Sequence, residues 1–340
     1  MLAAVTEPAP ASRRRRRLKL ALGLIVLAPA GFVAFSLFYL RHRTWEIPAE
    51  WRAPALAKAE PVPAAGNDHD DGLWLTWLGV TGYRLNDGVT TLLVDPTPTR
   101  PSGLGLLLPC ESDPELAKEW CPKADVILVN HAHHDHALDV PTIARQTGAQ
   151  VYGSQSSVNL CLSRGVPAAQ THVIKGGDTL TLGTFQVEVV ACYHSAIAGI
   201  QNPMAGVIPP DAGSLRWWQF GQDGCFAFRI KGGDVTLWDH PTSTYLPGSL
   251  GARTAPNLIV GITGEPLTEE RAKGIVSECK PRRVLPTHYD NFLQPIGKGL
   301  SLLPGLDIEE ARRHVEAADP KAAWWVLDFN QTVFLPPDED

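Results

Sequence analysis

Four histidines and two aspartates stand within ten consecutive residues, in the segment NHAHHDHALD at 130–139. Imidazole nitrogens and carboxylate oxygens are ligands for zinc and similar divalent metals. Clustered imidazoles would repel one another if they were protonated, and a bound metal ion would hold them neutral and oriented. The spacing of His131, His133, Asp135 and His136 therefore predicts a metal site rather than a polar surface loop.

The elements around this cluster predict where it lies in the fold. The run ADVILVN at 124–130 is apolar without alternation, which is typical of a strand buried on both faces. LDVPTIARQTG, at 138–148, predicts a helix. The cluster would then follow the carboxyl end of a buried strand, which is where open sheets place their functional residues.

The rest of the chain predicts an α/β fold in which sheets are covered by helices. Strands or hairpins are expected at 73–96, 178–192, 225–240 and 322–335, with a turn at Asn86–Gly88. A helix is expected at 268–280. Runs of strands with interposed helices, and no glycine-rich phosphate loop, favour this class.

The pattern His-x-His-x-Asp-His after an apolar strand resembles the metallo-β-lactamase superfamily. TWLGVTGYRLNDGVTTLLVDP at 76–96 is similar to that family's opening hairpin, and VLPTHYDNF at 284–292 is similar to the segment with its last metal histidine. The resemblance runs from about Leu73 to Phe334. Within the family, the chain looks most like the branch of L-ascorbate-6-phosphate lactonase and N-acyl-phosphatidylethanolamine phospholipase D.

The resemblance implies a four-layer αββα sandwich and a centre with two metal ions. The N-terminal segment, described below, adds the expectation of one transmembrane helix before this sandwich. The ions would be zinc, with manganese or iron as alternatives. The first would be held by His131, His133 and His194, and the second by Asp135, His136 and His288, with Asp239 bridging them. Two such metals can share a hydroxide nucleophile. Asp135 would also pass a proton to the leaving group.

Other residues near the motif receive weaker expectations. His134 stands at the variable position of the motif and is not expected to be a ligand. Asp139, four residues after Asp135, is expected to accept a hydrogen bond from a ligand imidazole, the alternative being a solvated acid at a helix N-terminus. Trp238 stands where the family usually has glycine before the bridging aspartate.

The function implied is hydrolysis of an ester or phosphodiester, with a small molecule or a lipid as substrate. A lactonase or β-lactam-type amidase is the alternative of the same fold, and a non-catalytic metal-binding protein is the alternative of another class.

Trp217 and Trp218, in the loop at 206–221, could cover the metals, bind an acyl chain, touch a bilayer or pack against the next hairpin. Arg216, Arg282 and Arg283 could receive a phosphate or be solvated. Pocket walls have no readable code, so the substrate-binding residues stay unknown.

The charge distribution divides the 340-residue chain. Residues 44–340 hold 22 basic and 35 acidic residues, a net charge of −13, and such a body should repel nucleic acids. The front holds an arginine run at 13–17 before a charge-free stretch at 20–40 that is long enough to cross a bilayer. We expect a basic cytoplasmic tail at 1–17, a membrane anchor at 18–40, a Pro/Ala-rich linker at 41–71 and the hydrolase domain at 72–340. This arrangement predicts a single-pass membrane protein with its catalytic domain outside the cytoplasm, with a cleaved export signal ending near Ala30 as the alternative.

Six cysteines are compatible with export. Cys110 with Cys121, and Cys192 with Cys225, are the disulfides we expect, and buried free thiols are the alternative. The sequence leaves connectivity and oligomeric state open.

Overall fold

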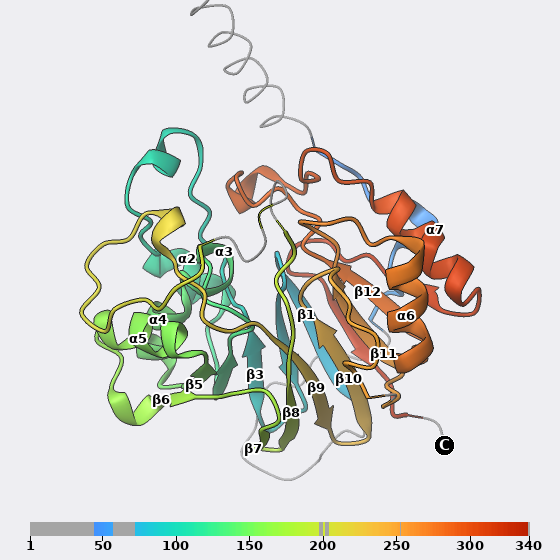
Figure 1. Ribbon diagram of the computed structural model, residues 1–340, viewed down its shortest axis with the longest axis horizontal. Helices are drawn as coiled ribbons and strands as arrows, with labels where there is room; N and C mark the ends of the chain where they lie inside the picture. The colour runs from blue at the N-terminus through green and yellow to red at the C-terminus, as the bar shows by residue number, and fades with distance from the viewer. Residues whose placement is uncertain (1–43, 57–71, 197–199, 201–203, 252, 339–340) are drawn as a thin grey trace, which may run out of the picture. The chain divides into compact units, whose positions relative to one another are not determined.

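The computed structural model describes residues 44–56, 72–196, 200, 204–251 and 253–338. Within these residues, two mixed seven-stranded sheets form a sandwich (Figure 1). The first sheet has the strand order β14-β1-β2-β3-β4-β5-β6. In chain order its strands are β1 (Leu73–Gly79), β2 (Gly82–Asn86), β3 (Thr91–Val94), β4 (Val126–Leu128), β5 (Gln150–Gly153), β6 (Thr171–Val173) and β14 (Thr332–Leu335).

The second sheet has the order β13-β12-β11-β10-β9-β8-β7. Its strands are β7 (Thr179–Leu182), β8 (Phe185–Ala191), β9 (Phe226–Gly232), β10 (Val235–His240), β11 (Asn257–Gly261), β12 (Arg283–Thr287) and β13 (Ala323–Trp324). β3 to β6 run parallel to one another, and so do β10 to β13. Each sheet therefore has a set of carboxyl ends at one edge, from which loops can carry functional residues.

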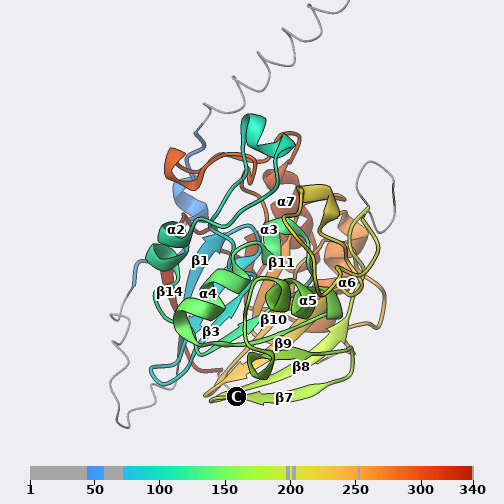
Figure 2. The same cartoon turned by 90° about the vertical axis from the view of Figure 1, so that its left-hand side faces the viewer.

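Helices cover the outer sides of this sandwich. Figure 1 and the turned view in Figure 2 show α2 to α5 beside the first sheet and α6 and α7 beside the second. Their bounds are α2 (Pro114–Trp120), α3 (His134–Ala137), α4 (Val140–Thr147), α5 (Gln155–Ser163), α6 (Glu269–Cys279) and α7 (Ile308–Ala318). Short 3-10 helices are η1 (Ala49–Trp51), η2 (Gly103–Leu107), η3 (Ala168–Gln170), η4 (Trp217–Gln219) and η5 (Ile296–Lys298). The expected α/β class is confirmed as a mixed two-sheet sandwich.

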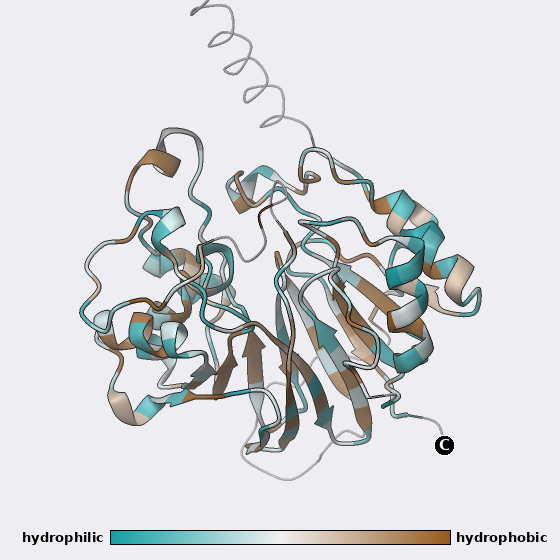
Figure 3. Ribbon diagram, viewed as in Figure 1, coloured by the Kyte–Doolittle hydropathy of each residue, from teal (hydrophilic) through white to brown (hydrophobic). Residues whose placement is uncertain are grey.

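Two hydrophobic clusters hold these layers together. One joins residues of both sheets, such as Tyr83 and Phe228, and the other lies between the first sheet and helices α2, α4 and α5. Val126 and Leu128 of β4 belong to the first cluster and Ile127 to the second. Apolar residues therefore fill both faces of β4, and Figure 3 shows brown stretches along strands of both sheets. The expectation of a strand buried on both faces before the histidine cluster is confirmed.

Part of the predicted linker belongs to the folded body. Ile47, Trp51 and Ala53 are buried in the first cluster, and Trp45 packs edge-on against Tyr289 at a ring-centroid distance of 6.1 Å. Composition predicted a tether because proline and alanine are frequent here, but burial of the few large apolar side chains stabilises the packed arrangement. Residues 44–56 thus pack on the folded body, residues 57–71 lie outside the described residues, and the domain bounds stay a prediction.

The structure contradicts the predicted membrane location. Among the helices in the described part of the chain, none combines the length and the apolar character needed to cross a bilayer. The segments at 1–17 and 18–40, from which an anchor was predicted, lie outside the described residues. The location at a membrane is accordingly withdrawn.

The two expected disulfides are absent from the described residues, where all six cysteines are free thiols. Burial raises the pKa of the Cys121 thiol to about 12, so this side chain behaves as a small apolar residue. The Sγ atoms of Cys192 and Cys225 nevertheless lie 3.0 Å apart.

Candidate metal centre

The histidine cluster lies where the carboxyl ends of several strands meet. His131 and His133 follow β4, His194 follows β8, and His288 follows β12. β4 ends at Leu128, after which the chain turns through Asn130 and starts the single-turn helix α3 at His134. This turn places Asp135 and His136 in a helical turn beside the two preceding histidines. The expected position at strand ends is confirmed.

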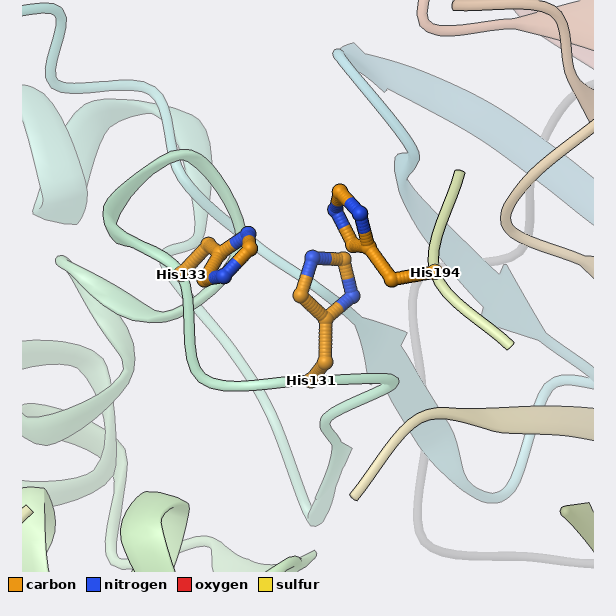
Figure 4. Close-up of side chains that lie close together, drawn as sticks. All are labelled: His131, His133 and His194. Carbon is orange, nitrogen blue, oxygen red and sulfur yellow. The ribbon is translucent and has the colours of Figure 1, made fainter. Parts of the chain in front are cut away.

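Six of the expected ligands form two compact groups. His131, His133 and His194 offer nitrogen atoms within 4.8 Å of one another, and so do the ligand atoms of Asp135, His136 and His288. Figure 4 shows the three rings of the first group turned toward one another, two from the loop after β4 and one from the segment after β8. The ring centroids of His131 and His136 are 3.8 Å apart, so the two groups adjoin.

Hydrogen bonds to the far side of two rings fix which nitrogen faces the centre. His136 Nδ1 lies 2.7 Å from Asp95 Oδ2 and 2.9 Å from Thr81 Oγ1. His194 Nδ1 lies 2.6 Å from the carbonyl oxygen of Ser195. Both acceptors favour a proton on Nδ1, which leaves Nε2 unprotonated and able to bind a metal.

Asp135 joins its group through close approaches to two imidazoles. Its Oδ2 lies 3.4 Å from His288 Nε2 and 3.9 Å from His136 Nε2. Burial by itself would raise the pKa of Asp135, but the imidazoles of His136, His288 and His134 together lower it well below the usual range. The carboxylate is therefore ionised at neutral pH.

Burial disfavours the protonated form of three histidines of the centre, His131, His133 and His136. Burial is the main cause that lowers the pKa of His133 and of His136 to about 3, and the neighbouring imidazoles lower that of His133 further. Burial also lowers the pKa of His131 well below its ordinary value. Neutral imidazoles are the form that binds a divalent metal.

Unpaired buried atoms support the fit of a metal to these residues. Both ring nitrogens of His131, Nε2 of His133 and Nδ1 of His288 are buried without a hydrogen-bond partner. A buried polar atom without a partner costs free energy, and so does a buried carboxylate without a cation. Two nitrogen-rich groups with such atoms have the ligand chemistry that zinc, iron or manganese requires.

Asp239 is buried near the centre but lies outside both groups. Its Oδ2 accepts a hydrogen bond of 2.9 Å from Asn130 Nδ2, and its Oδ1 is buried without a partner. Burial raises the pKa of Asp239 well above the ordinary range. The adjacent Trp238 is also buried, and its Nε1 donates to the carbonyl of Arg253. The bridging role of Asp239 stays a prediction.

The structure places Asp139 away from the imidazoles. Its Oδ2 accepts from the Thr99 amide at 2.7 Å, and its Oδ1 accepts from the Ser112 hydroxyl. The expected hydrogen bond to a ligand imidazole is not among those of the described residues. The reason is that α3 ends at Ala137, and Asp139 is the N-cap residue of the next helix, α4. Asp139 therefore anchors the segment at 99–112, and Asp95 takes the expected role.

Two residues that the sequence did not single out organise the centre. Asp95 directly follows β3 and accepts from the Asn130 amide with Oδ1 while Oδ2 faces His136. Asn130 also donates to the carbonyl of Phe226 and to Asp239, so it connects the two sheets. An acidic or amide residue within two positions after a buried parallel strand is the signal that would have found both.

Backbone strain is concentrated around the centre. Val80, Asp95 and His288 have positive φ angles of 51°, 43° and 59°. The His288 amide donates to the Val80 carbonyl at 2.8 Å, and Asp290 Oδ1 accepts from the Val80 amide at 2.9 Å. These contacts hold His288 in a conformation that non-glycine residues rarely adopt, which is typical of functional sites.

Comparisons with known proteins agree with this geometry. A family model described as a β-lactamase superfamily domain matches residues 74–288. A UPF0173 metal-dependent hydrolase of Cupriavidus taiwanensis is 28% identical over 274 residues, which cover 72% of this chain and 84% of the relative. A second one, from Cupriavidus necator, is 29% identical over 265 residues, covering 74% and 82%.

Solved structures share the fold. Igni18, a metallo hydrolase of the archaeon Ignicoccus hospitalis, aligns with a TM-score of 0.52 and 18% identity over 78% of this chain and 100% of its own. The metallo-β-lactamase fold protein YhfI of Bacillus subtilis aligns with a TM-score of 0.50 and 16% identity over 77% and 99%. At these identities the two structures show a common fold.

Proposed function

The chain is a metal-dependent hydrolase that belongs to the metallo-β-lactamase superfamily, and we propose that it cleaves an ester or a phosphodiester at a centre of two metal ions. The observation that carries the proposal is the pair of adjoining ligand groups, which both line one cavity of about 430 Å³. A protein that only stored metal would not need its ligands beside a cavity of this size.

The proposed ligands follow the two groups. His131, His133 and His194 would hold one ion and Asp135, His136 and His288 the other. Asp239, which lies outside both groups, would be a further ligand. We propose zinc, because imidazole and carboxylate suit it, with manganese or iron as alternatives. When bound, such ions lower the pKa of a water molecule and polarise the bond that is cleaved.

The chain's own residues orient the ligands and handle the proton. Asp95 and Thr81 fix the ring of His136, and the Ser195 carbonyl fixes that of His194. Asp135 is ionised, so it can accept a proton from the attacking water and donate it to the departing oxygen. The bond from the carbonyl carbon or phosphorus to that oxygen breaks, and an acid and an alcohol are released.

The test is metal content and hydrolysis by the full chain purified without chelator. We expect two metal ions per chain and turnover of p-nitrophenyl acetate or of bis-p-nitrophenyl phosphate. Asp135→Asn should lower kcat at least about 100-fold, in the range that general acid–base groups contribute. Asp139→Asn is the matched control, because it changes a buried aspartate of the same segment that touches Ser112 and Thr99 instead.

Other outcomes would change the proposal. Turnover of only a lactone or of a nitrocefin-type β-lactam would establish the lactonase or amidase alternative. Fewer than one metal ion per chain, or equal activity in the two variants, would refute a catalytic role for the cluster.

A further inference from the structure

The cavity at the metal centre has an apolar part that metal binding does not require. Besides the six ligands of the two groups, its lining includes Leu106, Met204, Trp217, Phe292, Leu293 and Leu303. Ligand pockets of enzymes are mostly apolar, with a few polar groups that fix orientation. The apolar side chains are therefore available for the part of the substrate that is not cleaved.

Two of these side chains are large and partly open to solvent. Trp217, in η4, is 38% exposed, and Leu293 is 37% exposed. Both line the cavity, so a ligand in the cavity would cover their exposed parts. The rings of Trp217 and Phe292 lie 6.4 and 6.2 Å from that of His134, the residue between the ligands His133 and Asp135. The apolar walls thus begin next to the metal ligands.

The cavity offers no basic side chain to an anionic substrate. Among the described residues that line it, none is lysine or arginine, and Asp135 is the one acid. Arg100 is buried in an ion pair with Asp290, and Arg216 lies over the ring of Trp218 with its Nε directed to the Leu107 carbonyl. Phosphate recognition usually employs arginine or lysine. A substrate without charge needs no such partner.

From these features we infer that the substrate is a neutral, open-chain carboxylic ester whose acyl chain is apolar and lies against Trp217 and Phe292. This inference rests on the proposed function and narrows it. Water adds to the ester carbonyl, the carbon–oxygen bond to the alcohol breaks, and the water proton passes through Asp135 to the departing oxygen. The products are a carboxylic acid and an alcohol, so no further reactant is needed.

The experiment compares p-nitrophenyl acetate, butyrate and octanoate with bis-p-nitrophenyl phosphate on the metal-loaded full chain. Each buried methylene group should raise kcat/KM by up to about fourfold. We expect octanoate to exceed acetate at least about tenfold. Trp217→Ala and Phe292→Ala should each reduce this ratio several-fold while they leave the metal content at the wild-type value.

Trp218→Ala is the matched control, because Trp218 is the adjacent tryptophan, is 43% exposed and is not part of the cavity lining. Its octanoate-to-acetate ratio should equal that of the wild type. Calorimetric binding of octanoate and acetate, the products, gives a readout that needs no turnover. Octanoate should bind more tightly than acetate, and Trp217→Ala should remove the difference.

The outcomes separate this inference from the proposed function. Equal kcat/KM for all three esters, or turnover of the phosphodiester alone, would overturn the inference and leave the hydrolase function standing. If no ester or phosphodiester were cleaved, the proposed function would fail, and the binding preference for octanoate would still decide whether the cavity takes an apolar chain. Equal loss of the ratio in Trp217→Ala and Trp218→Ala would also overturn the inference.

Discussion

Asp95 Oδ2 lies 2.7 Å from Nδ1 of His136, and both side chains are almost fully buried. The acid follows β3 and the histidine lies in α3, 41 residues later in the chain. Because β3 and β4 are parallel neighbours, their carboxyl ends bring the two residues together. A carboxylate on Nδ1 fixes the ring orientation and makes Nε2 a stronger ligand.

Replacing Asp95 should therefore weaken metal binding without removing a ligand. Asp95→Asn keeps the size of the side chain but replaces by an amide the carboxyl group whose Oδ2 faces His136 Nδ1. We expect the affinity for zinc to fall by about 10- to 100-fold, the usual effect of losing such a partner. Competition with a chromophoric chelator would measure it. An unchanged dissociation constant would show that Thr81 alone suffices to orient the ring.

Asp139, which does not contact the imidazoles, should affect the pH dependence of the free energy of unfolding and not the affinity for metal. Burial raises its pKa to about 6, although hydrogen bonds from Ser112 and Thr99 oppose the shift. Between pH 4 and 6 the folded chain then keeps a proton that the unfolded chain has released. The contribution of Asp139 to the free energy of unfolding is thus most favourable below pH 4 and falls as the pH rises through 6, by roughly 3 kcal/mol in all.

Asp139→Asn removes this titration. Relative to the wild type, the variant should gain up to about 3 kcal/mol in the free energy of unfolding between pH 4 and pH 7. Urea unfolding of both proteins with excess chelator, at several pH values, would measure the difference. A difference that stays constant with pH would mean that the Asp139 carboxyl group titrates normally.

The sequence predicted which histidines and aspartates come together better than it predicted the groups that orient them. His194 and His288 were found because each stands in a segment that resembles a family motif, although they lie far along the chain from the cluster. Asp95 was included only in the segment at 76–96 that resembles the opening hairpin, because which imidazole it meets depends on the order of strands in the sheet. Tertiary pairing of this kind has no local pattern.

The errors have physical causes too. Asp139 was expected to reach a ligand imidazole because it stands four residues after Asp135, but the helical turn ends at Ala137 and a new helix starts at Val140. The segment at 44–56 was assigned to a linker from its composition, while burial of Ile47 and Trp51 joins it to the body. The cavity walls come from loops, such as the one with Trp217, whose positions follow from packing instead of periodicity.

The two ligand groups should be separable by mutation. His133→Ala removes a ligand from the first group and leaves Asp135, His136 and His288 intact, so we expect the metal content to fall from two ions per chain to one. His288→Ala should have the same effect through the second group. His172→Ala is the control, because its ring stacks on Tyr152 and bonds to Gln150 outside the centre. Loss of both ions in each variant, measured by inductively coupled plasma mass spectrometry, would instead show one cooperative site.

The buried ion pair of Arg100 and Asp290 should be important for stability. The two side chains are 2% and 0% exposed, Arg100 Nη1 lies 2.5 Å from Asp290 Oδ2, and Asp290 also accepts from Val80. Asp290→Asn leaves the guanidinium buried without a counter-charge, so the free energy of unfolding should fall by about 3–5 kcal/mol. Glu316, whose side chain is 57% exposed, forms an i,i+4 pair with Arg312. Glu316→Gln breaks this pair and should lower the free energy of unfolding by less than about 0.5 kcal/mol. Chemical denaturation would measure both free energies of unfolding. Similar losses in the two variants would mean that the buried ion pair contributes no more to stability than the exposed one.

Cys192 and Cys225 should form a disulfide when a small disulfide oxidant is supplied. Their Sγ atoms are 3.0 Å apart, and the Cys192 amide donates to the Cys225 carbonyl at 2.9 Å, so the ends of β8 and β9 already hold the two thiols in reach of the 2.0–2.1 Å bond. Incubation with oxidised glutathione transfers two electrons to the oxidant and removes two hydrogens, so the intact mass should fall by about 2 Da. Peptide mapping should then place the bond between these two residues.

Cys192→Ser is the matched variant for this test. It removes one thiol of the pair and leaves the four buried cysteines outside the pair unchanged, so the same treatment should produce no intramolecular bond. The bond lies two residues before His194, and it should tighten the segment that carries this ligand. We therefore expect the oxidised wild type to keep its metal and to unfold at a higher temperature than the reduced protein. Loss of metal on oxidation would mean that closing the bond draws His194 away from the other two histidines.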